Sequence, residues 1–128
     1  MNKLSSLAKR VKCSAEYGNV KEADLDDWQR AAHPYRVTLR YKRRQMGLDF
    51  FMGPALTDEP DAAGVLSCLM SDASAAEQSF EEWCGDLGFD TDSRKAERMY
   101  RNCLRLAGKL HKLLGDDYDL FRKAEDDI

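Results

Sequence analysis

Residues 93–114 read SRKAERMYRNCLRLAGKLHKLL, and this stretch decides the fold. At about 100° per residue, a set of its apolar side chains shares one face of a helix. That set is Ala96, Tyr100, Cys103, Ala107, Leu110 and Leu114. Acids just before the stretch suit the positive end of a helix, and Gly115 is typical of the position just past its end. The sequence therefore predicts one long amphipathic helix from Ser93 to Leu114.

The outward face of this predicted helix carries a row of cations spaced three or four residues apart. They are Arg94, Arg98, Arg101, Arg105, Lys109 and Lys112. They cluster within roughly 80° along about 27 Å of helix axis. Such a row can follow the phosphates of a nucleic acid or dock on an acidic protein surface. The alternative is a solvated face covered by residues 53–92, a segment with ten acids and no Lys or Arg.

Upstream of the helix, the sequence changes to the period-2 alternation of β-strands. Residues 35–42 read YRVTLRYK, with apolar and polar side chains in alternation. Arg43-Arg44 supplies a turn, residues 45–52 form a second strand, and residues 11–17 form a third. The prediction is an α+β fold in one domain, residues 1–128: a small antiparallel β-sheet in the N-terminal half (β-rich 11–52) packed with a helical C-terminal half (60–124).

The predicted hairpin carries a second group of cations. Arg36, Arg40 and Lys42 share one strand face, with Arg43 and Arg44 at the tip. Two tyrosines, Tyr35 and Tyr41, interleave with them, but the alternation places these rings on the opposite face, in the core. The cations therefore form either a second basic binding patch or a guard against pairing of the sheet edge with another strand.

Two capping signals open the helices between the hairpin and the long helix. Asp61 is a suitable N-cap for a helix that carries Val65, Leu66 and Leu69 on one face. Ser79-Phe-Glu-Glu82 is a capping box, in which serine and glutamate satisfy each other's backbone donors. Cys68 and Cys103 lie among apolar neighbours at helical spacing, and we expect buried thiols rather than metal ligands or disulfides.

The acids of residues 53–92 are a candidate surface of their own, because the net charge of −3 hides this strong local excess. Carboxylates can imitate phosphates toward a basic groove on a partner protein. The candidates are Asp58, Glu59, Asp61, Asp72, Glu77, Glu81 and Glu82.

Catalytic and metal signatures are weak in this sequence. A calcium loop starting at Asp86 has a glycine, Gly88, at a ligand position and Thr91 where the turn requires glycine. The two histidines, His33 and His111, have no nucleophile partner suggested by spacing. We therefore predict no enzyme activity, no cofactor and no metal site.

The apolar runs are short, which bears on location. None approaches the roughly 18 residues needed to cross a bilayer, and the first ten residues have cations without a following apolar stretch. We expect a cytoplasmic protein with no membrane partner.

Several segments together resemble a group of small proteins from bacteriophages and mobile elements. They are His33–Lys42, Phe51–Pro60, Ser79-Phe-Glu-Glu-Trp and Asp92-Ser-Arg-Lys-Ala-Glu97. The group has no assigned activity, so the resemblance supplies no site residues and implies only a setting. Accessory phage proteins of this size often inhibit host defence, and anti-CRISPR proteins are among them.

The resemblance leads to one functional expectation and two alternatives. We expect an accessory protein that binds and inhibits a host defence complex, CRISPR–Cas first, by non-catalytic protein–protein contact in the cytoplasm of an infected bacterium. The alternative is a nucleic-acid-binding accessory protein that uses the helix row and the hairpin. A structural factor of the virion is a third class. The oligomeric state does not follow from the sequence.

Overall fold

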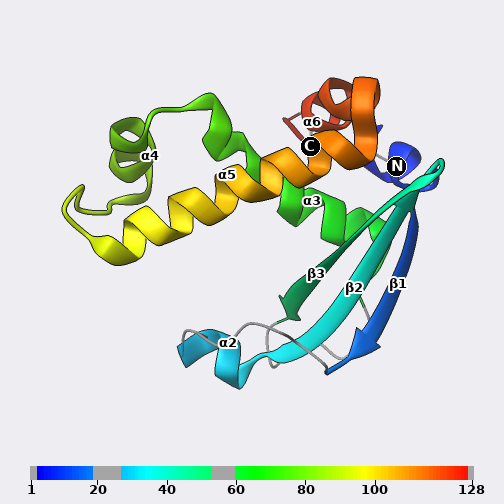
Figure 1. Ribbon diagram of the computed structural model, residues 1–128, viewed down its shortest axis with the longest axis horizontal. Helices are drawn as coiled ribbons and strands as arrows, with labels where there is room; N and C mark the ends of the chain where they lie inside the picture. The colour runs from blue at the N-terminus through cyan, green and yellow to red at the C-terminus, as the bar shows by residue number, and fades with distance from the viewer. Residues whose placement is uncertain (1–2, 19–26, 53–59, 127–128) are drawn as a thin grey trace.

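A three-stranded antiparallel sheet forms one end of the protein (Figure 1). The computed structural model describes residues 3–18, 27–52 and 60–126. The strands are β1 (Lys12–Tyr17), β2 (His33–Tyr41) and β3 (Arg44–Met52), in the spatial order β1-β2-β3. The predicted α+β fold with its N-terminal antiparallel sheet is confirmed.

The hairpin loop lies one residue earlier than the sequence predicts. Tyr41 is paired with Arg44, so the loop is Lys42-Arg43 and not Arg43-Arg44. Lys42 has a φ of 56°, in the left-handed region. Two-residue hairpin loops require positive φ at the first central position, usually supplied by glycine or asparagine. The missing glycine is why the sequence did not reveal the position of the loop.

The helices begin where side chains can satisfy their first backbone N–H groups. Asp61 accepts a hydrogen bond of 2.7 Å from the N–H of Gly64, Ser79 and Glu82 form the predicted capping box, and Ser93 caps the long helix. Their bounds are α1 (Lys3–Ala8), α2 (Asp27–Ala31), α3 (Ala62–Ala73), η1 (Ser74–Glu77), α4 (Phe80–Leu87), α5 (Arg94–Leu114), η2 (Gly115–Asp117) and α6 (Tyr118–Asp126). The predicted long helix and both capping signals are confirmed.

A large hydrophobic cluster, here called the main core, joins one face of the sheet to α1, α3, α6 and the C-terminal half of α5. Its fully buried side chains include Val37 and Leu39 from β2, Leu66 from α3, Leu110 from α5 and Phe121 from α6. Tyr35 and Tyr41 are also buried in it, on the face opposite the hairpin cations, as predicted.

A second cluster, here called the distal core, lies where α4 packs beside the N-terminal half of α5, away from the sheet (Figure 1). Trp83 is at its centre, with ring centroids 5.5 Å from Phe89 and 5.4 Å from Tyr100. Buried Ala96 and Cys84 complete it. Because α5 contributes to both cores, it fixes their relative positions.

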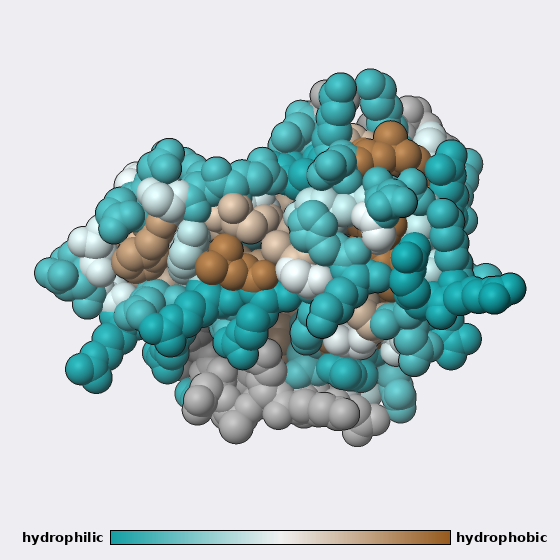
Figure 2. Space-filling view, turned by 45° about the horizontal axis from the view of Figure 1, so that its top comes forward, coloured by the Kyte–Doolittle hydropathy of each residue, from teal (hydrophilic) through white to brown (hydrophobic). Residues whose placement is uncertain are grey.

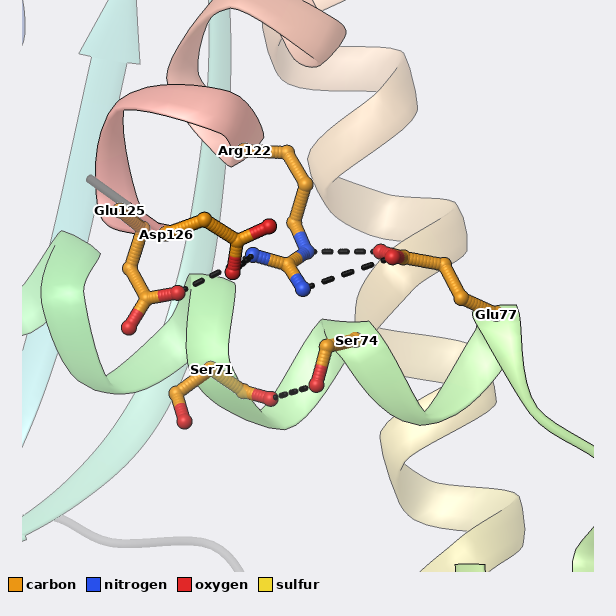
Figure 3. A network of polar contacts seen from close by, with 6 residues as sticks. All are labelled: Ser71, Ser74, Glu77, Arg122, Glu125 and Asp126. Carbon is orange, nitrogen blue, oxygen red and sulfur yellow. Dashed lines mark hydrogen bonds and ion pairs between the residues drawn. The ribbon is translucent and has the colours of Figure 1, made fainter. Parts of the chain in front are cut away.

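A charged network connects α6 to the segment between α3 and α4 (Figure 3). The guanidinium of Arg122 donates to Glu77 of η1 over 2.7 Å, and to Glu125 and Asp126 of its own helix over 3.0 and 2.6 Å. The Arg122 side chain is only 12% exposed. The network therefore ties the main core to the connection that leads into the distal core.

The four cysteines are all free thiols. The prediction that Cys68 and Cys103 are buried is wrong. Cys68 is exposed and Cys103 is half-buried, whereas Cys84 is buried. Cys68 lies on the side of α3 that borders a surface hollow, one residue away from Leu69, which faces the core. Within the described part of the chain, no helix is long and apolar enough to cross a membrane.

Candidate functional site

The cations of α5 form an exposed row on the helix. Arg94, Arg98, Arg101, Arg105, Lys109 and Lys112 are all solvent-exposed. Arg101 pairs with Glu97 and Arg105 bonds the side chain of Asn102, both within α5. Arg94, Arg98, Lys109 and Lys112 form no ion pair with any residue that the structure describes. Four charges of the row are therefore available to a partner. We call these six residues the α5 row.

The acidic segment does not neutralise this row through ion pairs between described residues. The Asp61 carboxylate accepts from the N–H of Gly64 and the Glu82 carboxylate from the N–H of Ser79, both at helix N-termini, and Glu77 pairs with Arg122 on α6. Glu81 is exposed in the first turn of α4. The predicted acidic candidates Asp58 and Glu59 lie outside the described residues. Asp61, Glu77 and Glu82 therefore each have a partner within the fold.

The hairpin cations are divided by the structure into paired and exposed groups. Arg36 forms an ion pair of 3.1 Å with Asp49, and its guanidinium lies against Gly47, where a Cβ atom would be 2.7 Å from Nη2. Lys42 pairs with Asp117 of η2 over 3.2 Å. Arg40 and Arg43 are exposed. Two cations of the predicted hairpin patch, Arg36 and Lys42, therefore form ion pairs within the fold.

The tip of the hairpin reaches the end of α5. The Tyr41 hydroxyl donates to Asp117 over 2.6 Å, and the Arg44 guanidinium lies against Gly115, where a Cβ would be 2.7 Å from Nη1. A cation at the C-terminal end of a helix is favourable, since the last carbonyl groups carry partial negative charge. These contacts bring β3 alongside α5.

Two adjoining hollows follow the line where β3 meets α5, and we call them together the β3–α5 groove. One has a volume of about 730 Å³ and the other of about 390 Å³, and they share Gly47 and Lys109. Helix α5 contributes Asn102, Arg105, Leu106, Lys109, Lys112 and Leu113, while β3 contributes its residues from Arg44 to Phe51. The larger volume lies within the range of about 300–1,000 Å³ that is usual for ligand sites.

The groove brings together residues that the sequence assigned to separate sites. Lys109 and Lys112 of the α5 row line the smaller hollow together with Arg44 of the hairpin. Arg105 of the row lines the larger hollow together with Arg36. Asn102, Gln45 and Gly47 were not predicted, because nothing local in the sequence shows that β3 and α5 are neighbours. The N-terminal part of the α5 row, Arg94, Arg98 and Arg101, lies outside both hollows.

Three titratable groups have raised pKa values: Asp72 and Cys68, which line the larger hollow, and Cys103, which is not part of its lining. Partial burial raises the pKa of Asp72. Partial burial, together with the charge of Asp72, raises the pKa of Cys103 to about 11 and also raises the pKa of Cys68. Thiols with raised pKa values are protonated at neutral pH and are weak nucleophiles.

The histidines have structural neighbours. His111 stacks on Tyr118 with ring centroids 3.5 Å apart, and His33 lies 6.2 Å from the ring of Tyr17. Among the described residues, no group of three or more His, Cys, Asp or Glu side chains is placed to hold a metal ion.

Comparison of the chain with known protein families, curated proteins and solved structures finds no match. The surface chemistry of the described residues is therefore the basis for a functional proposal. Much of the face seen in Figure 2 is hydrophilic, with apolar patches between the polar side chains. The α5 row carries six exposed cations, and the β3–α5 groove is lined by five cations and by two acids, Asp49 and Asp72.

Proposed function

We propose that the protein is a non-catalytic binding protein of a bacteriophage or mobile element, and that it binds and blocks a host defence complex, with CRISPR–Cas as the first system to test. The observation that carries the proposal is the α5 row, in which four exposed cations have no ion-pair partner among the described residues. The setting comes from the sequence resemblance. In this setting, the α5 row is the surface that binds the host defence complex.

The charge of this face favours an acidic protein surface as its counterpart. Complementary charges speed the encounter between proteins and disfavour wrong partners. Because the row lies on a helix supported by both cores, its cations are held along one line of about 27 Å without ordering a loop on binding. A rigid, preorganised face loses less entropy when it binds.

A phage-plaquing assay tests the proposal directly. The protein is expressed in bacteria that carry CRISPR immunity against the phage, and we expect plaquing to be restored for at least one system type. Replacing Arg94, Arg98 and Arg101 together by Glu should remove the restoration, because it reverses the charge of three exposed residues of the row.

The matched control is a triple variant with the same change in net charge. Lys9, Lys12 and Lys123 are exposed and lie outside the α5 row, so their replacement by Glu should leave plaquing restored. If the wild-type protein restores plaquing against no CRISPR–Cas type, the inhibitor proposal is wrong. If both triple variants restore it equally, the α5 row is not the binding surface.

A second candidate, nucleic-acid binding, is favoured by one specific observation. Lys109 and Lys112 of the α5 row and Arg44 of the hairpin line the same hollow, so the two basic regions adjoin. A protein that contacts phosphates loses affinity steeply with salt, with a slope in log–log form of about −0.9 for each phosphate neutralised on duplex DNA.

Fluorescence anisotropy with labelled duplex DNA and RNA separates the two candidates. Binding at physiological salt with a slope near −5 would mean that the whole row contacts phosphates. The Arg94, Arg98 and Arg101 triple variant should then lower the magnitude of the slope by about 3, and the Lys9, Lys12 and Lys123 control should leave it unchanged. Absence of binding at physiological salt would exclude this candidate.

A further inference from the structure

The edge of β3 that faces away from β2 is the unusual feature of the β3–α5 groove. In the order β1-β2-β3, no described strand pairs with β3 on its second edge. All of its residues from Arg44 to Phe51 line one hollow or the other. Successive strand residues point to opposite faces, so an unbroken run of them borders a groove only along the strand's edge. The backbone of β3 therefore forms one wall of the groove.

Two residues of this wall direct unused backbone groups into the groove. In a hairpin with a two-residue loop, the residues flanking the loop form a hydrogen-bonded pair, here Tyr41 and Arg44. The alternation of an antiparallel ladder then turns the N–H and C=O of Gln45 and Gly47 away from β2. Neither residue forms a backbone hydrogen bond with a described residue outside the sheet. An unpaired edge of this kind is a template for another strand.

The opposite wall supplies charge and apolar surface. Arg105, Lys109 and Lys112 project from α5, and Leu106 and Leu113 lie between them. Arg44 adds a further cation at the hairpin end. A strand laid along β3 would turn every second side chain toward α5, where acidic side chains meet cations and apolar ones meet leucines.

We infer that the β3–α5 groove binds an extended, acidic segment of the partner protein, which adds to β3 as a fourth strand. This inference rests on the proposed function, in which the partner is a protein. Strand addition draws affinity from backbone hydrogen bonds and specificity from alternate side chains. A single-stranded nucleic acid matches the cations but has no alternating N–H and C=O groups to pair with Gln45 and Gly47.

A synthetic peptide tests this mode of binding with the full-length protein. The probe is a fluorescein-labelled octapeptide of alternating Glu and Val, which spans about 26 Å when extended. We expect saturable binding by fluorescence anisotropy. Two control peptides should bind at least about tenfold more weakly: one with alternate amides N-methylated, which cannot form the ladder, and one with Lys in place of Glu.

Two sets of variants test separately whether the peptide binds to the edge of β3 and whether it binds to the cations of α5. Gln45→Pro removes an outward N–H at an edge position where proline is tolerated, while Gln45→Thr keeps it. We expect the proline variant to weaken peptide binding about 3- to 10-fold relative to the threonine variant. The double variant Lys109→Glu with Lys112→Glu should weaken it at least about tenfold, and Arg94→Glu with Arg98→Glu should change it by less than about threefold.

The contrary outcomes are distinct. Equal binding of the N-methylated peptide, or equal affinity of the two Gln45 variants that retain a wild-type melting temperature, would overturn strand addition. Tighter binding of an oligothymidylate of about eight nucleotides at the same groove would assign the groove to nucleic acid. If the Lys109 and Lys112 double variant loses neither peptide binding nor plaquing restoration, the groove inference is wrong while the function proposed for the α5 row stands.

Discussion

The main core and the distal core share α5 but are built in different ways. The main core joins segments that are far apart in the chain, with aliphatic side chains from β2, α3 and α5 and the ring of Phe121 from α6. Among the residues that the structure describes, the distal core draws on positions 75–103, and it is dominated by aromatic rings around Trp83. One core is therefore assembled through long-range contacts, and the other through neighbouring segments.

This difference divides the basic face of α5, formed by the α5 row, into two halves that are supported by different cores. The main core holds the C-terminal half of α5 against β3 and so forms the groove with Lys109 and Lys112. The distal core supports the half that presents Arg94, Arg98 and Arg101, away from the sheet. We therefore expect damage to one core to affect one half of the face more than the other.

The largest expected effect is damage to the main core by Phe121→Ala. Phe121 is fully buried and its ring centroid lies 5.5 Å from that of Tyr41. Truncation of a buried aromatic ring leaves a cavity and costs about 3–5 kcal/mol in the free energy of unfolding. Urea unfolding followed by circular dichroism measures the loss. Leu120→Ala, at a neighbouring position that is 48% exposed, should cost less than about 1 kcal/mol.

The next effect is a local one, from Trp83→Ala in the distal core. Trp83 stacks near Phe80, Phe89 and Tyr100, so its loss removes the centre of that cluster. We expect the amides of α4 to lose protection by up to about 3 kcal/mol, while those of β2 keep theirs, because the two cores open separately. Hydrogen exchange read by mass spectrometry distinguishes the two regions.

The control for this variant is Leu87→Ala, in the same helix but 54% exposed, which should leave exchange unchanged. Equal loss of protection in α4 and β2 after Trp83→Ala would mean that the two cores unfold as one cooperative unit. The comparison between them would then fail.

The third effect tests the link between the cores, through Arg122→Gln. The guanidinium of Arg122 bonds Glu77 over 2.7 Å across the gap between α6 and η1. Its replacement should lower the free energy of unfolding by about 1–2 kcal/mol at low salt, and by less in 1 M NaCl, where ionic attraction is screened. Lys123→Gln, at an exposed neighbouring position, should have no measurable effect. If the midpoint of urea unfolding is the same for Arg122→Gln as for the wild-type protein, the network does not couple the cores.

The smallest effect is a pH dependence at the hairpin tip. The hydrogen bond from Tyr41 and the charge-assisted bond from Lys42 lower the pKa of Asp117, so this carboxylate stabilises the fold above about pH 4 and loses that contribution as the pH falls through its lowered pKa. The bond to Asp117 raises the pKa of Tyr41, so that contribution is present below about pH 10 and is lost as the pH rises through the raised pKa.

Melting temperatures between pH 2 and pH 11 test this pair. The variant Tyr41→Phe should lose stability less steeply in acid than the wild-type protein, and should lack the alkaline loss that Tyr41 contributes. Identical pH profiles for the two proteins would mean that the Tyr41–Asp117 bond does not stabilise the fold.

The features that the sequence predicts correctly depend on residues close together in the chain. The capping box needs only Ser79 and Glu82, and the buried face of α5 follows from the spacing of Ala96, Ala107 and Leu110. The hairpin also joins two segments that are close in the chain. Its strands are predicted correctly, and only the loop lies one residue earlier than the sequence predicts. Local physical chemistry determines each of these elements.

The features that the sequence does not predict depend on contacts between distant segments. The exposure of Cys68 follows from the hollow that forms where α3, α5 and β3 meet. The pairing of Lys42 with Asp117 joins the hairpin to η2. Periodicity places Lys109 on the outside of α5, but it does not show that β3 runs beside it. The groove is therefore visible only in three dimensions.

The passage of α5 through both cores also sets the lengths that this helix can take. One residue inserted near Leu104 would rotate everything after it by about 100°, so that Leu110 would turn from the main core while Ala96 stayed in the distal one. An insertion of seven residues restores the rotational phase to within about 20° and adds about 10 Å. The helix thus works as a spacer with a fixed pitch, and the separation between the two halves of the basic face of α5 can change only by close to a whole number of turns.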